Sequence, residues 1–245
     1  MAEDVFFAFD LDGTVTKAEI LPALAREAGV FDEIFRLTAM TLRGEIPFEA
    51  SFRTRFNLLR CLPVADAQRV TAAIPLDPHI TAFIVENRDC CAIVTGNLDC
   101  WIAPLVETLG CAVYCSRSEC VDGELALASV LDKGAVVRNI AGTGQRVIAI
   151  GDAANDIPMF MAADFGIAYG GVGEPAPGLL AAAHRVERDA LSLCRLLRTI
   201  RDSGTIPCLV KMNASGGQGS SLLSMPVRAS KTRLRLKAPL HPAIE

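Results

Sequence analysis

The sequence predicts an α/β protein: a doubly wound parallel, Rossmann-like sheet core with an inserted small helical cap domain. Apolar strand-like runs alternate with helix-like segments through residues 77–204, which is typical of a parallel sheet covered by helices. A first strand, residues 5–9, precedes this alternation and ends in acidic residues. A long helical stretch without strand alternation separates that strand from the rest, which indicates an insertion.

The core is expected to use residues 1–16 and 77–204. After the first strand, its predicted elements are helix 78–87, strand 90–94, helix 98–109, strand 111–114, helix 130–141, strand 146–150, helix 157–162, strand 165–168 and helix 190–201. Asp122-Gly123 predicts the turn of a short hairpin, since this dipeptide suits two consecutive positive φ angles.

The helical cap is expected to span residues 17–76. Its helical pattern runs to about residue 73 and is interrupted at Gly29, at the segment from Gly44 to Pro47, and at Pro63. Both prolines suit the first turn of a new helix, where a missing backbone N–H leaves no hydrogen bond unmade.

Composition and charge fit an ordinary globular domain. The 245 residues are 51% hydrophobic and 21% charged, and the net charge of −4 argues against a nucleic-acid partner. Residues 205–245 hold six basic side chains and one acidic one, and they include a Gly- and Ser-rich stretch without helix or strand period. We expect this basic tail to be disordered.

The nine cysteines have no disulfide-like or zinc-like spacing, which predicts free, buried thiols in a reducing compartment. Asp10 already lies at the first strand, so we expect no cleavable signal peptide. No apolar run reaches the length of a membrane span. We therefore expect a cytoplasmic protein without a membrane partner.

Two carboxylates two residues apart follow the first strand. The apolar residues 5–9 end in Asp10-Leu11-Asp12-Gly13-Thr14, and ligands of α/β proteins bind at the carboxyl ends of central strands. Two acidic groups there are costly to desolvate unless a cation or a reaction uses them. Asp10 and Asp12 therefore predict a Mg²⁺-type site that handles phosphoryl groups.

Three further segments follow predicted strands and suit the same site. Thr95-Gly96-Asn97 offers a hydroxyl and backbone N–H groups to phosphate oxygens, although a Thr before a helix is ordinarily a cap. Lys133 offers a positive charge, although a lone helical Lys is usually solvated. Asp152 and Asp156 repeat the acidic strand end, although a polar turn that caps the next helix would explain one of them.

In chain order these segments read DxDGT, TGN, Lys and GDxxND, and the set resembles the haloacid dehalogenase superfamily. The resemblance covers residues 4–202. Residues 151–160 are similar to the GDGANDxxM signature of the phosphoserine phosphatase branch, and residues 25–29 and 48–55 are similar to its cap. The resemblance implies a Mg²⁺-dependent phosphomonoesterase of serine biosynthesis that acts on a small phosphorylated metabolite, with phosphoserine the first candidate.

The resemblance implies a role for each residue of the site. Asp10 is the expected nucleophile, which forms an aspartyl-phosphate, and Asp12 is the expected general acid and base. The Asp10 side chain, the Asp12 backbone carbonyl and Asp152 are expected to bind Mg²⁺. Asp156 is expected either to hold a water molecule of the metal or to orient Lys133. Together with Thr95, Lys133 is expected to stabilise charge on the transferring phosphoryl group.

Substrate choice is expected to reside in the cap. On a helix starting near Pro47, Arg55 borders the apolar face, whereas Arg53 points more toward solvent. In the resembled branch, residues matching Glu19 and Arg55 grip the substrate's ammonium and carboxylate groups, and a bidentate arginine contact suits a carboxylate. The alternative is two surface charges on a polar cap.

Gly96, Asn97 and Asn155 are also expected to contact the substrate, and Asn155 is equally suited to cap a helix. The chain departs from the branch at two places in the cleft. Asn97 stands where the branch usually has Gly, and residues 167–172 replace its familiar Ala-Lys-Pro ending. Both departures concern the substrate more than the reaction class.

Two other functions are compatible with the motifs. A phosphotransferase or mutase could use the same aspartyl-phosphate while excluding water. A mutase needs a second phosphate pocket, and the cap has no dense basic cluster beyond Arg53, Arg55 and Arg60. A non-catalytic binding protein could retain the fold, but the presence of every expected catalytic residue argues against it.

Overall fold

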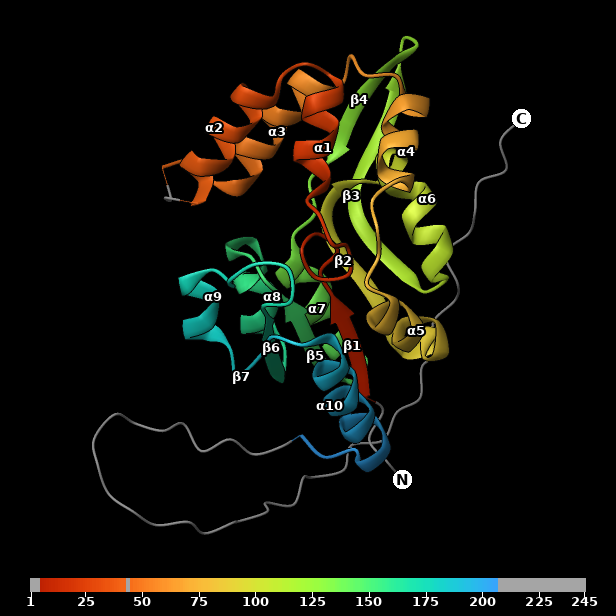
Figure 1. Cartoon of the computed structure of the whole chain (residues 1–245), viewed down its shortest axis with the longest axis vertical. Coiled ribbons are helices and arrows are strands. Elements are labelled where there is room, and N and C mark those ends of the chain that lie inside the picture. The colour runs from red at the N-terminus through yellow and green to blue at the C-terminus, as the bar shows by residue number, and fades with distance from the viewer. Residues whose placement is uncertain (1–4, 43–44, 207–245) are drawn as a thin grey trace. The chain divides into compact units, whose positions relative to one another are not determined.

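The computed structural model describes residues 5–42 and 45–206, and a seven-stranded sheet forms the centre of this part of the chain (Figure 1). The strands are β1 (Val5–Phe9), β2 (Cys91–Leu98), β3 (Ala112–Val121), β4 (Glu124–Ser129), β5 (Arg146–Gly151), β6 (Phe165–Tyr169) and β7 (Arg185–Glu187). Their order in the sheet is β4-β3-β2-β1-β5-β6-β7, and only β3 and β4 pair antiparallel. The predicted α/β class is confirmed. The predictions made for residues 207–245 lie outside the described residues.

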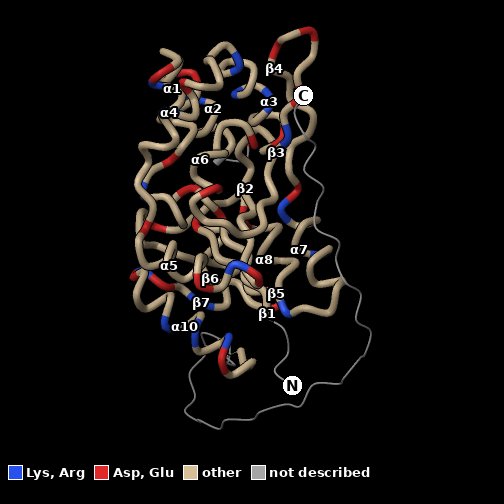
Figure 2. Tube along the Cα trace, turned by 90° about the vertical axis from the view of Figure 1, so that its right-hand side faces the viewer, with Lys and Arg blue, Asp and Glu red and all other residues tan. Residues whose placement is uncertain are grey.

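Helices cover both faces of the sheet. The core helices are α5 (Pro78–Glu86), α6 (Asp99–Leu109), α7 (Lys133–Ala141), α8 (Ile157–Ala162), α9 (Pro177–Ala182) and α10 (Ala190–Ser203), with 3₁₀ turns at η1 (Arg88–Cys90) and η2 (Ala154–Asp156). Phe7 and Phe9 of β1 pack into the apolar cluster under α5, α6 and α10, whereas Phe6 and Ala8 pack into the one under α7, α8 and α9. Figure 2 shows α5 and α7 on opposite sides of the strands. β1 is thus buried on both faces, as a central parallel strand should be.

The largest differences between the structure and the predicted elements are at three places, and α7 also begins three residues later than predicted. β2 continues past Val94 through the Thr-Gly-Asn segment to Leu98, which pairs with Ser116 beyond a register shift. β3 is much longer than predicted because its polar second half pairs with β4 instead of β2. α9 and β7 were not predicted, since a six-residue helix and a three-residue strand carry too little periodicity. The predicted hairpin turn is confirmed: Asp122 and Gly123 both have positive φ, at 51° and 83°.

The helical insertion contains α1 (Ile20–Glu27), α2 (Phe31–Leu42), α3 (Phe48–Leu59) and α4 (Val64–Ala72), and α1, α2 and α3 lie beyond the carboxyl end of β1 (Figure 1). Pro47 and Pro63 stand at the N-cap positions of α3 and α4, one residue before the first turn in which they were expected. Thr16 and Leu76 form an isolated antiparallel bridge. The two ends of the insertion therefore lie side by side where they join the core.

The cap helix α4 is bonded to a defect in the core helix α6. Pro104 lies inside α6 and has no N–H, so the carbonyl of Cys100 lacks its helical donor. Gln68 of α4 supplies one instead: its Nε2 donates to Cys100 O at 2.9 Å. Thr71 Oγ1 donates to Trp101 O at 2.7 Å from the same face of α4. Two side chains of the cap thus donate to two carbonyls of the core.

The cysteines among the described residues are all free, as predicted. The expectation that they are buried is wrong for Cys61 and Cys120, which are exposed. Among the described residues, no helix combines the length and the apolar character needed to cross a membrane.

We expect Gln68→Ala to lower the free energy of unfolding by about 1 kcal/mol, because the Cys100 carbonyl then loses its donor. In a Pro104→Ala background, residue 104 can donate its own N–H to the Cys100 carbonyl. Gln68→Ala should then lower the free energy of unfolding by less. Urea unfolding of the four proteins measures this coupling. Gln145→Ala, which removes a bond to Thr143 within one loop, should cost the same in both backgrounds. An equal cost of Gln68→Ala in both backgrounds would contradict the compensation.

Candidate active site

The carboxyl ends of β1, β2 and β5 meet at one edge of the sheet. The parallel register pairs Phe9 with Ile93 of β2 and with Ile150 of β5. Asp10 N donates to Ile150 O at 2.8 Å, which continues this register past the end of β1. The register brings Thr95 and Asp152 to the edge at which Asp10 emerges.

Lys133 places a buried positive charge between two carboxylates. Its side chain is 4% exposed, and its Nζ donates to Asp10 Oδ1 and, at 2.6 Å, to Asp156 Oδ1. Lys133 begins α7 because Asp132 caps that helix by accepting from Ala135 N at 2.9 Å. Burial alone would lower the pKa of Lys133, but Asp10 and Asp156 raise it above its usual value. The alternative of a solvated lysine is therefore wrong.

Asp156 holds the loop after β5 closed. Its side chain is fully buried, and its Oδ2 accepts from the backbone N–H groups of Asp152 and Ala153, both at 3.0 Å. A Cβ on Gly151 would lie 2.4 Å from Asp156 Oδ2, so glycine is needed for this approach. Of the two roles expected of Asp156, the bond that its other oxygen accepts from Lys133 Nζ supports the orientation of Lys133.

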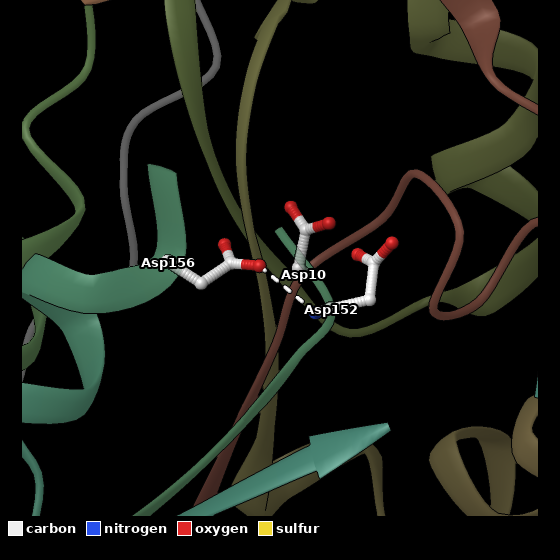
Figure 3. A group of neighbouring side chains, drawn as sticks. All are labelled: Asp10, Asp152 and Asp156. Atoms are coloured by element: carbon white, nitrogen blue, oxygen red, sulfur yellow. Dashed lines mark hydrogen bonds between the residues drawn. The ribbon is translucent and has the colours of Figure 1, made fainter. Parts of the chain in front are cut away.

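Asp10 and Asp152 point to a common space at the strand ends. Figure 3 shows their carboxylates directed to the same side, while Asp156 reaches across toward the backbone of Asp152. One oxygen from each of the three residues lies within 4.8 Å of the others. The loop after β1 approaches so closely that a Cβ on Gly13 (φ +68°) would lie 2.4 Å from Asp152 Oδ2, and Thr14 Oγ1 donates to Asp152 Oδ1 at 3.4 Å. These hard oxygen donors fit a divalent cation that prefers oxygen ligands.

The electrostatics of the cluster favour a cation. Burial raises the pKa of Asp10 well above its usual value, the charge of Asp156 raises it further, and Lys133 opposes both effects. Burial and then Asp156 raise the pKa of Asp152 to about 7. One lysine therefore does not neutralise the cluster, and a bound cation would relieve the remaining repulsion.

Asp12 is held at both of its carboxylate oxygens. Its Oδ1 accepts from the backbone N–H of Ile20, the first residue of α1, at 2.7 Å. Its Oδ2 accepts from Asn97 Nδ2. Burial raises the pKa of Asp12, and these two hydrogen bonds oppose the shift.

Thr95 and Asn97 are buried in the extended end of β2 rather than in a loop. The hydroxyl oxygen of Thr95 accepts from Asn97 N at 3.2 Å and from Asn97 Nδ2 at 3.0 Å. Phe48 of α3 lies against Gly96, where a Cβ would meet the ring at 2.7 Å. The cap thus touches the core at the glycine between these two polar residues.

The prediction that Arg55 borders the apolar face of its helix is confirmed, since Arg55 is among the buried residues of α3. It is 6% exposed, whereas Arg53 is exposed and pairs with Glu49 at 2.9 Å. The guanidinium of Arg55 lies over the Phe48 ring, at 5.7 Å from its centroid, and donates to Ser51 O at 3.3 Å. It forms no ion pair within 4.0 Å with any described residue. Burial lowers the pKa of Arg55 to about 10, so the group stays charged at neutral pH.

Glu19 immediately precedes α1 and is exposed. Partial desolvation, followed by the charges of Asp12 and Asp152, raises its pKa. Asn155 lies half-buried in η2, and its side chain makes no hydrogen bond with a described residue. The alternative of a helix-capping Asn155 therefore has no contact to support it.

Four groups that shape the site were not among the predicted site residues. Gly13, Thr14 and Gly151 allow the two acidic loops to approach each other, and the N–H of Ile20 binds Asp12. The glycines beside Asp12 and Asp152 were a usable signal, because close backbone approach is a common reason for glycine. The bond from Ile20 had no such signal, since any residue carries a backbone N–H.

The sequence pattern of the haloacid dehalogenase-like hydrolase family matches residues 7–161. The chain is 32% identical over 212 residues to a phosphoserine phosphatase of Halobacterium salinarum, covering 80% of this chain and 97% of that protein. It is 32% identical over 181 residues to a phosphoserine phosphatase of Archaeoglobus fulgidus, covering 68% of this chain. The chain spans 53% of the length of the Archaeoglobus protein.

Solved structures agree with this relationship. A phospho-aspartyl intermediate analogue of phosphoserine phosphatase superposes with a TM-score of 0.66 at 29% identity, over 82% of this chain and 98% of that one. A substrate-bound phosphoserine phosphatase complex gives a TM-score of 0.66 at 28% identity, over 82% and 99%. The similarity thus includes the helical insertion as well as the sheet.

We expect Gly151→Ala to displace the Asp156 carboxylate, because the new Cβ would lie 2.4 Å from Asp156 Oδ2. The thermal midpoint should fall by several degrees, consistent with a cost of about 1–3 kcal/mol for overpacking a tight site. Gly173→Ala is the matched control, because a Cβ there meets nothing within 4 Å. Equal midpoints for the two variants would show that the loop tolerates the side chain.

We also expect the metal-free protein to gain stability as the pH falls from about 8 to about 6. The pKa of Asp152, about 7 in the folded chain, exceeds its ordinary value of 3.8. Between these limits the folded state binds more protons than the unfolded state, so stability rises as pH falls. The thermal midpoint in EDTA should therefore rise by about 2–4 °C.

Mg²⁺ should raise the same midpoint more at pH 8 than at pH 6, since the cation and the protons relieve the same repulsion. Asp152→Asn should weaken both effects. An Mg²⁺ effect that is independent of pH would contradict the linkage.

Proposed function

The chain belongs to the haloacid dehalogenase-like hydrolase family, and on this basis we propose that it is a Mg²⁺-dependent phosphomonoesterase that acts through an aspartyl-phosphate on Asp10. The substrate is a small phosphorylated metabolite, with phosphoserine the first candidate. One observation carries the proposal: the Asp10 carboxylate lies at the end of a central strand with one oxygen bonded to Lys133. Its other oxygen is left to attack phosphorus.

The reaction divides into two displacements. An oxygen of Asp10 attacks phosphorus while the bond from phosphorus to the ester oxygen breaks, and Asp12 gives a proton to that leaving oxygen. In the second displacement Asp12 takes a proton from water, which attacks the aspartyl-phosphate and releases inorganic phosphate. Asp12 is suited to both steps because its neighbours hold it beside Thr95 at the end of β2.

The groups around the phosphoryl oxygens are positively polarised. Lys133 and the Thr95 hydroxyl would stabilise the charge that spreads over these oxygens during transfer. The side chains of Asp10 and Asp152, with the backbone carbonyl of Asp12, would hold Mg²⁺. When bound, Mg²⁺ would neutralise carboxylate charge and bind a phosphoryl oxygen.

The cap supports an amino-acid phosphate as substrate. Arg55 is a buried cation without an ion-pair partner among the described residues, which favours an anionic ligand such as a carboxylate. Glu19 precedes α1 on the same cap and offers an exposed carboxylate that an ammonium group would pair with. The similar relatives are named phosphoserine phosphatases. The substrate contacts of Gly96, Asn97 and Asn155 stay predictions.

The proposal is tested by phosphate release from L-phosphoserine, phosphothreonine and sugar phosphates, with and without Mg²⁺. We expect Mg²⁺-dependent release with a preference for phosphoserine, abolished by Asp10→Asn. Release from other esters alone would retain the mechanism and reject the substrate. Activity of Asp10→Asn, or no Mg²⁺-dependent turnover by the wild type, would reject the mechanism in favour of a transferase or a binding protein.

Arg55→Ala should raise KM for phosphoserine by about 10- to 100-fold, as expected for the loss of a hydrogen-bonded charge pair. KM for phosphoethanolamine, which lacks the carboxylate, should stay within about twofold. Arg53→Ala on the same helix is the matched control and should change neither value, because Arg53 is exposed. A similar rise for both substrates would show that Arg55 does not read the carboxylate.

A further inference from the structure

Asn97 joins two groups that the proposed function places at different sites of the phosphoryl group. Its side chain is 3% exposed, and its Nδ2 donates both to Asp12 Oδ2 and, at 3.0 Å, to Thr95 Oγ1. Its backbone N–H donates to the same Thr95 oxygen at 3.2 Å. A single residue thus contacts the proton donor and a ligand of the phosphoryl oxygens.

The bonds from Asn97 determine the direction of the Thr95 hydroxyl. A hydroxyl oxygen can accept two hydrogen bonds and donate one. Asn97 supplies both bonds that Thr95 Oγ1 can accept, from its backbone and from its side chain. The hydroxyl hydrogen of Thr95 is therefore left to donate, which is the direction that a phosphoryl oxygen requires.

Asn97 also determines where Asp12 points. An ionised carboxylate only accepts, so the amide must present its NH₂ group to Asp12. Ile20 N holds the other oxygen of Asp12 at 2.7 Å. Each carboxylate oxygen can accept a further hydrogen bond, so the two neighbours orient Asp12 without occupying it.

We propose that Asn97 is a positioning residue for the leaving-group step: it aims Asp12 at the ester oxygen while it directs the Thr95 hydroxyl at the phosphoryl group. The inference rests on the proposed function. In that step the bond between phosphorus and the ester oxygen breaks, the proton of Asp12 moves to this oxygen, and Asp12 becomes a carboxylate that retains its bond from Asn97. Without Asn97, Asp12 is held at one oxygen only.

The test compares esters that differ in their need for a proton. An alkyl phosphate such as phosphoserine needs its leaving oxygen protonated, whereas p-nitrophenolate leaves readily as an anion. Asn97→Ala should lower kcat/KM for the alkyl ester by about 10- to 100-fold, the size expected when a catalytic group is misplaced by about 1 Å. For p-nitrophenyl phosphate the loss should be several-fold smaller, because this ester is affected only by the misdirected Thr95 hydroxyl and does not need a proton from Asp12 on its leaving oxygen.

Two variants separate positioning from packing. Asn97→Asp keeps the shape of the side chain but replaces the donor to Asp12 by an acceptor, so it should reproduce the selective loss even where Asn97→Ala folds poorly. Ser116→Ala is the matched control, because Ser116 Oγ donates to Gly96 O at 2.7 Å in the same segment without touching Asp12 or Thr95. It should change both esters by the same factor. Thermal unfolding verifies that each variant is folded.

The outcomes distinguish this inference from the function on which it rests. Equal losses on both esters for Asn97→Ala, or wild-type activity of Asn97→Asp, would overturn the positioning role while the phosphatase stands. No turnover of either ester by the wild type would reject the proposed function first, and the inference with it. A selective loss on the alkyl ester, absent in Ser116→Ala, would establish the role.

Discussion

Lys133 brings one positive charge into a space that several carboxylates share, and the arrangement of the strand ends depends on it. Its ammonium group bonds Asp10 and Asp156 at once, and Asp156 in turn bonds the backbone after β5. Removing one partner of a buried ion pair costs about 3–5 kcal/mol, because the other charge stays buried. Loss of any one of Asp10, Asp156 and Lys133 should therefore destabilise the other two. The net negative charge that remains favours the binding of a cation.

The cap meets the core through two kinds of contact. α4 donates hydrogen bonds to the carbonyls of Cys100 and Trp101, which fixes this helix to α6 by bonds that have no part in the proposed chemistry. α1 and α3 instead bring a backbone N–H to Asp12 and an aromatic ring to Gly96. One helix of the cap, α4, therefore binds the cap to the core, whereas α1 and α3 contact the site. α4 can support the position of these two helices without itself forming part of the site.

The sequence was informative where chemistry and periodicity coincide. The acidic pairs after β1 and β5 could be placed at one site because the strand ends of a parallel sheet share an edge. The position of Arg55 could be predicted because its angle on α3 follows from helical geometry. The burial of Lys133 was not visible locally, since its partners are 123 and 23 residues away. The bond from Asn97 to Asp12 spans 85 residues, and only the assembled sheet reveals that this amide contacts a carboxylate.

The bridge between Thr16 and Leu76 has an evolutionary consequence. Lys17 N donates to Pro75 O and Asp77 N donates to Val15 O, both at 2.8 Å, so the backbone on either side of the insertion is tied to itself. Whatever chain is spliced between these positions begins and ends at adjacent points, and β1 is not displaced by its length or content. Insertions of different sequence could therefore replace one another between these positions while the strand ends that carry Asp10 and Asp152 keep their places.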